Sequence, residues 1–324
     1  MQLQNVLNRY EKDLKIVEDY LDEQQQSYVH LIPEISRHII TSGGKRLRPL
    51  LLIISSDLCG YHGDRRFMLA AVMEFIHTAS LLHDDVIDHA TIRRGKASAN
   101  TVWGNSASVL VGDYLYSKSF KVLADDEDPA VQKLLSMTTT TMVEGEIAQL
   151  MRAGSVEASE KEYLSVIEKK TAVLISSSCA VGGVLAGAPE LQIEALARFG
   201  MRLGMAYQLT DDALDYVAEE NEFGKAIGTD LREGKITLPL IWALRKCTAD
   251  ERKGMNEILE RKAEQSGDIE HVMDIIDKYD GIAQALKRAE QYIEEGKGYL
   301  EQFADAPAKE ALIAIADYVV KRRL

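Results

Sequence analysis

Apolar residues recur at intervals of three and four along most of the chain, which is the spacing of amphipathic helices. The same spacing occurs in residues 269–279 and again after Gly281. Near the N-terminus two runs of this kind follow each other: Leu3, Val6, Leu7, Tyr10, Leu14, Val17 and Leu21, then Leu31, Ile32, Ile35 and Ile39. Sustained alternation of apolar and polar residues, which is typical of strands, is absent from the sequence. The pattern therefore predicts an all-α protein.

Two stretches depart from this pattern. Residues 138–141 are four threonines, which are β-branched and locally favour a strand. Because they lie between helical patterns, we expect tertiary context to keep them helical. Residues 171–189 carry no charge over nineteen positions, yet their serines and glycines make them only weakly apolar. Small residues permit close helix packing. This stretch is therefore predicted to be a buried helix and not a membrane span.

Segments rich in glycine, proline and charged residues mark the connections between the predicted helices. We expect loops at residues 60–64, 91–98, 125–129, 154–159, 219–235 and 267–268. None of them resembles a flexible interdomain linker. The sequence thus predicts a single domain over residues 1–324, in which the N-terminal helix in residues 1–24 is a candidate dimer contact.

Composition narrows the class of protein. Hydrophobic residues at 46% and charged residues at 27% are typical of an ordinary globular protein. The net charge of −13 argues against general nucleic-acid binding, although basic clusters at 45–48, 93–96 and 225–235 suit an anionic substrate. Three cysteines without metal-ligand spacing predict reduced thiols, and the charged N-terminus excludes a secretory signal. We therefore expect a cytoplasmic protein.

A first acidic motif lies in residues 77–96, which read HTASLLHDDVIDHATIRRGK. On a helix, Asp84 and Asp88 would project side by side, with His77 seven positions earlier on nearly the same face. Clustered carboxylates repel each other unless a cation joins them, and Mg²⁺ is the natural partner because it also binds phosphate oxygens. Arg93 and Arg94 follow, and arginine binds phosphate with two parallel hydrogen bonds.

A second acidic motif repeats the same spacing at Asp211, Asp212 and Asp215, again on a predicted helix. It too is followed by cations, at Lys225 and Lys235. Either motif alone could be a solvated helix end. Two such triads on two helices could instead face each other and hold metal ions between them.

Residues 43–49, which read GGKRLRP, form a third motif. They do not match the phosphate loop of nucleotide hydrolases, because Arg46 stands where serine or threonine is required and the first glycine is missing. What remains is a turn after a predicted helix with cations at Lys45, Arg46 and Arg48. Such a turn suits a diphosphate.

Together the three motifs resemble those of the trans-isoprenyl diphosphate synthases, also called trans-polyprenyltransferases, from about residue 25 to the C-terminus. The resemblance implies a single-domain isoprenoid-synthase helical bundle around a central cavity. It implies an enzyme that condenses isopentenyl diphosphate head-to-tail with farnesyl or geranylgeranyl diphosphate. It further implies a homodimer, with transient membrane contact at most when product is released. From charge and composition we expect no nucleic-acid partner and no transmembrane segment.

The resemblance also implies roles for particular residues. Isopentenyl diphosphate would be bound by Lys45, Arg48, His77 and Arg94. Three Mg²⁺ ions would be held through Asp84, Asp88, Asp211 and Asp215. The allylic diphosphate would be contacted by Arg93, Lys170, Thr171, Gln208, Lys225 and Lys235, and the residues expected to act in catalysis are Asp84, Asp85, Asp88, Asp211, Lys170 and Lys225. Asp230 is a further candidate, near the water shell of the metal.

Product length is suggested by the residues five and four positions before the first motif. In the resembled family, bulky aromatic residues there stop chain growth early, whereas here they are the small Ala79 and Ser80. The hydrophobic tunnel is therefore expected to be open. The predicted product lies in the heptaprenyl to decaprenyl range of about 35 to 50 carbon atoms, with about 40 favoured, and would serve as a quinone side-chain precursor.

Two other functions remain open at this point. One is the catalytic subunit of a two-component heptaprenyl diphosphate synthase, which the sequence does not separate from a self-sufficient enzyme. The other is a class I terpene cyclase, which uses the same metal chemistry. A cyclase usually carries only one aspartate-rich motif, and this chain has two, together with a basic cluster for a second diphosphate. The cyclase is therefore the weaker alternative.

Overall fold

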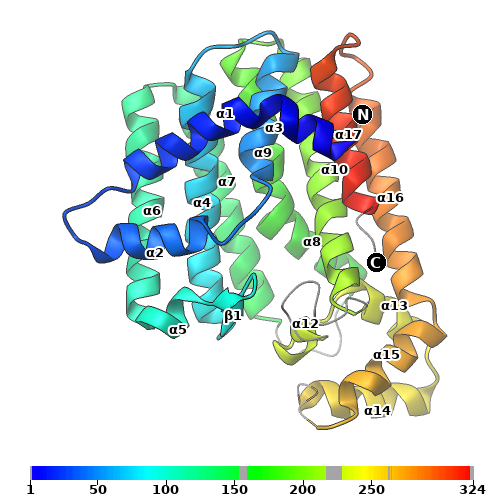
Figure 1. Cartoon of the computed structure of the whole chain (residues 1–324). Coiled ribbons are helices and arrows are strands. Elements are labelled where there is room, and N and C mark those ends of the chain that lie inside the picture. Colours follow the sequence, from blue (N-terminus) through cyan, green and yellow to red (C-terminus); the bar gives the residue numbers. More distant parts are fainter. Residues whose placement is uncertain (1, 153–158, 217–227, 262, 264, 322–324) are drawn as a thin grey trace. The chain divides into compact units, whose positions relative to one another are not determined.

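The structure, a computed structural model, describes residues 2–152, 159–216, 228–261, 263 and 265–321. Helices make up almost all of it (Figure 1), so the predicted all-α class is confirmed. The contacts divide the chain into two compact units. Unit 1 comprises residues 1–139, 174–200 and 299–315, and unit 2 comprises residues 140–173, 201–298 and 316–324. Each unit is thus assembled from segments that are far apart in the sequence.

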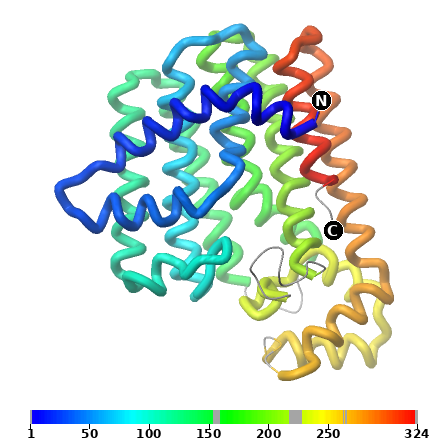
Figure 2. Tube along the Cα trace, viewed as in Figure 1, coloured from blue at the N-terminus to red at the C-terminus, as the bar shows by residue number. Residues whose placement is uncertain are grey.

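Unit 1 is built around α4, which contacts α1, α2, α3, α5 and α6. The chain enters this unit first, as the blue-to-cyan part of the trace shows (Figure 2). Because α3 and α4 are buried on nearly all sides, their central residues are apolar all round and not striped. The elements of unit 1 up to residue 126 are α1 (Leu3–Gln24), α2 (Leu31–Ile40), α3 (Leu47–Leu58), α4 (Arg65–Ile87), β1 (Ile92–Arg93), β2 (Lys96–Ala97), α5 (Ala99–Trp103) and α6 (Asn105–Asp126).

Unit 2 contains its own apolar core, in which Tyr216, Leu240 and Met255 are fully buried. The elements that belong to it are α8 (Glu160–Ile167), the π-helical turn η1 (Glu168–Ala172), α12 (Thr229–Arg232), α13 (Leu238–Lys246), α14 (Ala249–Glu260), α15 (Asp268–Lys278) and α16 (Gly281–Tyr299). The remaining helices are α9 (Val173–Leu185), which lies in unit 1 apart from its first residue, and α7 (Pro129–Leu150), α10 (Glu190–Leu214) and α17 (Pro307–Lys321), which contribute residues to both units.

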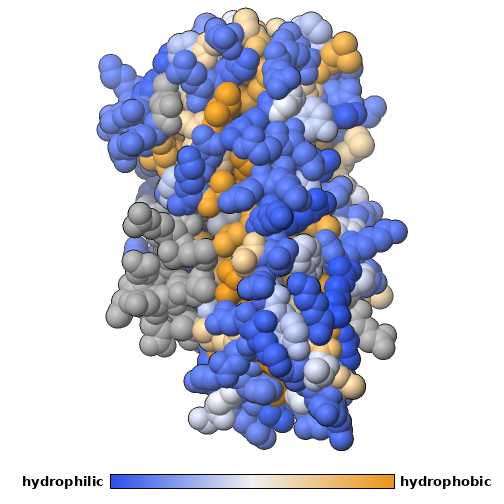
Figure 3. Space-filling model, turned by 90° about the vertical axis from the view of Figure 1, so that its right-hand side faces the viewer, coloured by the Kyte–Doolittle hydropathy of each residue, from blue (hydrophilic) through white to orange (hydrophobic). Residues whose placement is uncertain are grey.

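The two exceptional stretches of the sequence are helical, as predicted. Thr138 and Thr139 lie within α7, where each hydroxyl donates a hydrogen bond to the carbonyl four residues earlier. The uncharged stretch forms α9, which is buried along most of its length. Among the described residues, no helix is both long enough and apolar enough to span a bilayer. The face shown in Figure 3 is accordingly dominated by hydrophilic side chains.

Two predicted loops contain regular structure. Residues 91–98 include the short antiparallel hairpin of β1 and β2, in which Ile92 pairs with Ala97. Residues 219–235 include the single-turn helix α12, while the part of this loop in residues 219–227 lies outside the described residues. Both elements are only a few residues long, and so short a segment carries no readable periodicity.

Close packing of α9 on α3 depends on Gly182. A Cβ atom at this position would lie 2.6 Å from the backbone nitrogen of Ser56 and 2.7 Å from the carbonyl oxygen of Leu52. Backbone atoms cannot move aside as a flexible side chain can. The helices therefore approach each other at a distance that only glycine permits.

This packing yields a matched pair of predictions. Gly182→Ala should lower the free energy of unfolding by about 1–3 kcal/mol or more, because the new methyl group overlaps backbone atoms. Gly254→Ala, in α14, should instead raise it by about 0.5–1 kcal/mol, because nothing lies within 4 Å of the added methyl group and alanine favours helix. Denaturant unfolding of both variants measures this. Equal effects of the two changes would contradict the packing argument.

Candidate active site

The first acidic motif occupies the C-terminal end of α4, with Asp88 as the residue that caps the helix. The backbone N–H of Asp88 donates to the carbonyl of Asp84 at 2.8 Å, so these two side chains stand one turn apart on one face, and both are half-buried. Carboxylates at a helix C-terminus oppose the helix dipole, at a cost of about 0.3–1 kcal/mol each. A bound cation would remove this conflict.

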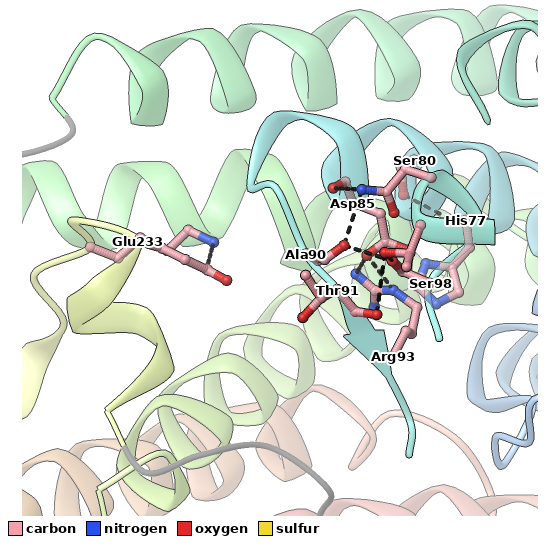
Figure 4. A network of polar contacts seen from close by, with 11 residues as sticks. His77, Ser80, Asp85, Ala90, Thr91, Arg93, Ser98 and Glu233 are labelled. Atoms are coloured by element: carbon pink, nitrogen blue, oxygen red, sulfur yellow. Dashed lines mark hydrogen bonds and ion pairs between the residues drawn. The ribbon is translucent and has the colours of Figure 1, made fainter. Parts of the chain in front are cut away.

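Asp85, the middle carboxylate of the motif, points elsewhere. It is completely buried, and its Oδ1 accepts a hydrogen bond of 2.7 Å from Nε of Arg93, whose Nη2 lies at 2.6 Å. Figure 4 shows the two side chains directed at each other. Asp85 therefore serves as a counter-ion for Arg93 in this structure. The expected contacts of Arg93 with an allylic diphosphate and the catalytic role of Asp85 stay predictions.

The hairpin after α4 presents Arg94 at its turn. Arg94 and Gly95 have φ values of 51° and 74°, which is the pattern of a two-residue type I′ turn. The segment is tied to the helix by Asn100, whose Nδ2 donates to the carbonyls of Asp85 and Ala90 at 3.1 and 3.0 Å. The hydroxyl of Ser98 donates to the carbonyl of Ala90 as well, at 2.6 Å (Figure 4). These bonds fix where Arg94 lies.

Three of the four residues predicted to bind isopentenyl diphosphate come together in unit 1. Burial lowers the pKa of His77 well below its usual value, and the positive charges of Arg48 and Arg94, with Arg93 and Arg46, lower it further. The guanidinium of Arg94 also lies against Gly44, where a Cβ atom would be 2.9 Å from Nη1. The fourth residue, Lys45, is exposed on the adjoining turn. A neutral imidazole among arginines is suited to receive an anion.

Arg46 plays a different part from its neighbours in the basic turn. Its Nη1 lies 2.7 Å from Oε1 of Glu74 in a nearly buried ion pair, and its Nη2 donates to the carbonyl of Ile40. This arginine joins the turn to α4 and α2. The roles predicted for Lys45 and Arg48 in binding isopentenyl diphosphate stay predictions.

The second acidic motif has the same internal division. It lies at the end of α10, where the N–H of Asp215 donates to the carbonyl of Asp211 at 3.1 Å, and both of these side chains are half-buried. The middle residue, Asp212, is buried and accepts hydrogen bonds from the hydroxyl of Tyr163 at 2.5 Å and from Nε2 of Gln208 at 2.7 Å. In both motifs, therefore, the second carboxylate is buried and held by side-chain donors, whereas the first and third are half-buried.

Burial raises the pKa of Asp212 above its usual value, and the negative charges of Asp230 and Asp211 add to the rise. The hydrogen bonds from Tyr163 and Gln208 act in the opposite direction, because they stabilise the carboxylate. Asp215 receives a further bond on Oδ2 from the N–H of Asp230, at 3.2 Å. The proposed link of Asp230 to a metal water shell stays a prediction.

Lys170 and Thr171 lie on the π-helical turn η1, a feature that often marks functional sites and that sequence reasoning missed. Gly145 allows α7 to approach this turn, since a Cβ atom there would lie 2.8 Å from the backbone nitrogen of Lys170. Nζ of Lys170 is 2.6 Å from Oε2 of Glu146, and the hydroxyl of Thr171 donates to Oε1 of Gln208 at 2.9 Å.

The remaining predicted site residues are placed as follows. Nζ of Lys235 lies 2.6 Å from Oε2 of Glu233, and Lys225 lies outside the described residues. Ala79 is completely buried in α4, and the hydroxyl of Ser80 donates to the carbonyl of His77 at 2.8 Å. The structure does not test their roles in substrate binding or product length.

Magnesium fits the donor set of each motif on chemical grounds. Among the described residues, no three histidine, cysteine, aspartate or glutamate side chains form a group that could hold a metal ion. Each motif instead presents two carboxylates, and Mg²⁺ is usually bound by one or two carboxylates together with waters and substrate phosphates. That the two motifs share metal ions stays a prediction.

Comparison with known proteins defines the class to which this fold and these motifs belong. The crystal structure of a polyprenyl synthase from Caulobacter crescentus matches with a TM-score of 0.96 at 36% identity, covering 100% of this chain and 98% of that one. The structure of a decaprenyl diphosphate synthase from Rhodobacter capsulatus matches with a TM-score of 0.93 at 39% identity, covering 99% of both chains. The class is that of the helical prenyltransferases, as predicted.

Sequence comparison identifies the family. The polyprenyl synthetase profile matches residues 29–276. The octaprenyl diphosphate synthase of Haemophilus influenzae is 37% identical over 322 residues, which cover 99% of this chain and 98% of that protein. The octaprenyl diphosphate synthase of Escherichia coli is 36% identical over the same length. The chain belongs to the polyprenyl synthetase family, and the resemblance inferred from its motifs is confirmed.

The cluster around His77 predicts a distinctive titration. Because the folded state disfavours the charged imidazole, His77 should remain neutral as the pH falls from 8 to 6, and protein stability should decrease once the unfolded state protonates below about pH 6.5. NMR of the histidine ring measures this directly. Arg48→Met should raise the pKa of His77, since it removes one of the facing positive charges. Half-protonation of wild-type His77 near pH 6.5 would contradict the assignment.

Proposed function

We propose that this prenyltransferase condenses isopentenyl diphosphate head-to-tail with an allylic diphosphate and makes a long-chain all-trans polyprenyl diphosphate. The observation that carries the proposal is the cluster of Arg48, His77 and Arg94, in which His77 lies on α4 about two helical turns before Asp84. An anion site for one substrate thus adjoins carboxylates suited to a metal. The names of the octaprenyl and decaprenyl synthases that resemble this chain support a product of about 35 to 50 carbon atoms, with about 40 favoured.

The cofactor we propose is Mg²⁺, with three ions per active site as the family resemblance implies. Asp84 and Asp88 would supply ligands from the first motif, and Asp211 and Asp215 from the second. A divalent ion has a parallel in the Caulobacter crescentus relative, whose structure is described as a complex with calcium and isoprenyl diphosphate. When bound, Mg²⁺ supplies the Lewis acidity that stabilises the charge on a departing diphosphate.

The chain's own residues orient and hold the two substrates. Lys45, Arg48 and Arg94 neutralise isopentenyl diphosphate, and the neutral imidazole of His77 can donate one N–H without adding charge. The allylic diphosphate, derived from farnesyl or geranylgeranyl alcohol, is contacted by Arg93, Lys170, Thr171, Gln208, Lys225 and Lys235. Cationic groups placed at the leaving diphosphate favour its departure, because they stabilise the anion that develops.

Carbon–carbon bond formation then needs positioning and no covalent enzyme intermediate. Departure of diphosphate leaves an allylic cation, which the alkene of isopentenyl diphosphate attacks. The resulting cation loses a proton, and the released diphosphate accepts it. Holding both substrates in the reactive geometry supplies much of the rate.

We also propose a cytoplasmic homodimer that touches the membrane only when a long product is released. Support for an oligomer comes from α7, where Val143, Ile147 and Leu150 are half or more exposed. These apolar residues follow the four- and three-residue spacing of one helix face. The N-terminal helix α1 was predicted as a dimer contact, and this prediction too remains to be tested.

One alternative has specific support. Component 2 of the heptaprenyl diphosphate synthase of Bacillus subtilis is 34% identical over 311 residues. By analogy, this chain could require a second subunit. Product analysis decides between the alternatives: the purified chain is given farnesyl diphosphate, labelled isopentenyl diphosphate and Mg²⁺, and the prenyl alcohols are separated after dephosphorylation.

A ladder that ends at one long prenyl alcohol is the expected result and would establish an independent enzyme. No incorporation by a folded sample would indicate a missing subunit. Consumption of farnesyl diphosphate without elongation would instead indicate a terpene cyclase and overturn the proposal.

The metal assignment predicts that Asp84→Ala lowers turnover at least about a hundredfold, because the first motif loses a ligand. The melting temperature should change little, since Asp84 is only half-buried. Asp19→Ala, at an exposed ion pair on α1, is the matched control and should keep full activity. Mg²⁺-dependent turnover that is unchanged in Asp84→Ala would refute the assignment.

The tunnel hypothesis predicts that Ala79→Phe shortens the product, because a phenyl ring would block the growing chain. Ala79 is completely buried, so overpacking could also cost about 1–3 kcal/mol of stability. Ser80→Phe, at a half-buried position, serves as the second variant. The chain lengths of the products are compared with those of the wild type by chromatography, using variants whose melting temperatures match that of the wild type. An unaltered product spectrum from both folded variants would rule the hypothesis out.

A further inference from the structure

A hydrogen-bonded chain in unit 2 joins the second acidic motif to the π-helical turn. The hydroxyl of Tyr163 donates to Oδ2 of Asp212, and Nε2 of Gln208 donates to Oδ1 of the same carboxylate. The hydroxyl of Thr171 in turn donates to Oε1 of Gln208. The three distances are 2.5, 2.7 and 2.9 Å. Tyr163 is the one member of this chain to which neither the sequence motifs nor the family resemblance assigns a role.

The π-helical turn places Tyr163 and Thr171, the two ends of this series of hydrogen bonds, on the same side of the helix. Tyr163 and Thr171 are eight residues apart, which in a regular α-helix would place them about 80° from each other around the axis. A π turn holds one residue more than an α turn, so two successive turns then take about eight residues. Tyr163 on α8 and Thr171 on η1 therefore face the same side, toward Gln208 and Asp212 of α10.

Gln208 and Asp212 are likewise one turn apart on α10, so the helix is held at two points on one face. Asp211 precedes Asp212 by one residue, about 100° around the helix, and Asp215 shares the face of Asp211. Fixing Asp212 inward thus determines where the other two carboxylates project. Without a donor from Tyr163, a buried carboxylate would lose one of its two side-chain partners, which costs free energy and favours a different orientation.

We propose that Tyr163 is a positioning residue for the second acidic motif: by donating to Asp212 it fixes the end of α10 so that Asp211 and Asp215 present their carboxylates to a divalent cation. This inference rests on the proposed function, because it assumes that the motif binds metal. Removing a group that orients metal ligands without touching the metal typically lowers metal affinity by about 10- to 100-fold. Tyr163 would act in this way without touching metal or substrate.

Tyr163→Phe tests the proposal, since it removes the hydroxyl and keeps the ring. The Mg²⁺ concentration for half-maximal turnover should rise at least about tenfold, while turnover at saturating Mg²⁺ stays within a few-fold of the wild type. A second readout needs no turnover: the increase in melting temperature caused by Mg²⁺ with inorganic diphosphate should require about tenfold more Mg²⁺.

Tyr279→Phe is the matched control. The hydroxyl of Tyr279 donates to Oε2 of Glu251 at 2.7 Å, so the same substitution removes the same type of bond elsewhere in unit 2. It should leave both Mg²⁺ dependences unchanged. A purely structural role of Tyr163 would lower the melting temperature without metal and leave the Mg²⁺ dependence as in the wild type. That result would overturn the proposal.

Asp212→Asn keeps the experiment decisive if Tyr163→Phe folds poorly. Asparagine has the size of aspartate but only one acceptor oxygen for two donors, so it should shift the Mg²⁺ dependence in the same direction. Adding Tyr163→Phe to Asp212→Asn should then produce little further shift in the Mg²⁺ dependence, because both substitutions disrupt the same hydrogen bond between Tyr163 and Asp212. Fully additive shifts would show that Tyr163 acts independently of Asp212. A wild-type protein that neither elongates substrate nor gains stability from Mg²⁺ and diphosphate would refute the proposed function itself.

Discussion

The constraint on which this structure depends is the placement of carboxylates at the C-terminal ends of two helices. Asp84 and Asp88 end α4, and Asp211 and Asp215 stand at the end of α10. Negative charge at this end of a helix opposes the dipole, and neighbouring carboxylates repel each other. Such an arrangement is disfavoured in the absence of a cation. A divalent cation bound at each helix end, as we propose, would make the arrangement favourable.

The fold resolves this constraint in the same way twice, with different chemistry. In each motif the middle carboxylate is buried and held by side-chain donors, whereas the outer two are half-buried. Asp85 is held by the guanidinium of Arg93, whereas Asp212 is held by the neutral donors Tyr163 and Gln208. Burial raises the pKa of Asp212, and the hydrogen bonds from its two neutral donors offset that rise only in part. The second motif is thus the more dependent on hydrogen-bond geometry.

Backbone geometry, as well as charge, determines where Arg94 lies in the cluster of basic residues around His77. Arg94 lies in a hairpin turn with positive φ and rests against Gly44, where a side chain would meet its guanidinium. Asn100 and Ser98 fasten this hairpin to the end of α4. Because Arg94 is held in this way, little conformational entropy would be lost if it bound an anion, as we propose. Burial lowers the pKa of His77, and the same concentration of positive charge lowers it further.

The sequence by itself determined the helical class and the helices with strong periodicity, such as α1 and α15. It also determined that Asp84 and Asp88 share one helix face and that Asp211 and Asp215 share another, because these features depend on spacings of three and four residues. Only the tertiary structure decided which charges serve the fold. Arg46 pairs with Glu74, 28 residues away, and Tyr163 bonds Asp212, 49 residues away. The π-helical turn at Lys170 was likewise not predicted from the sequence. Local spacing fixes which side chains share a helix face, but the partner that buries or neutralises them comes from a distant segment.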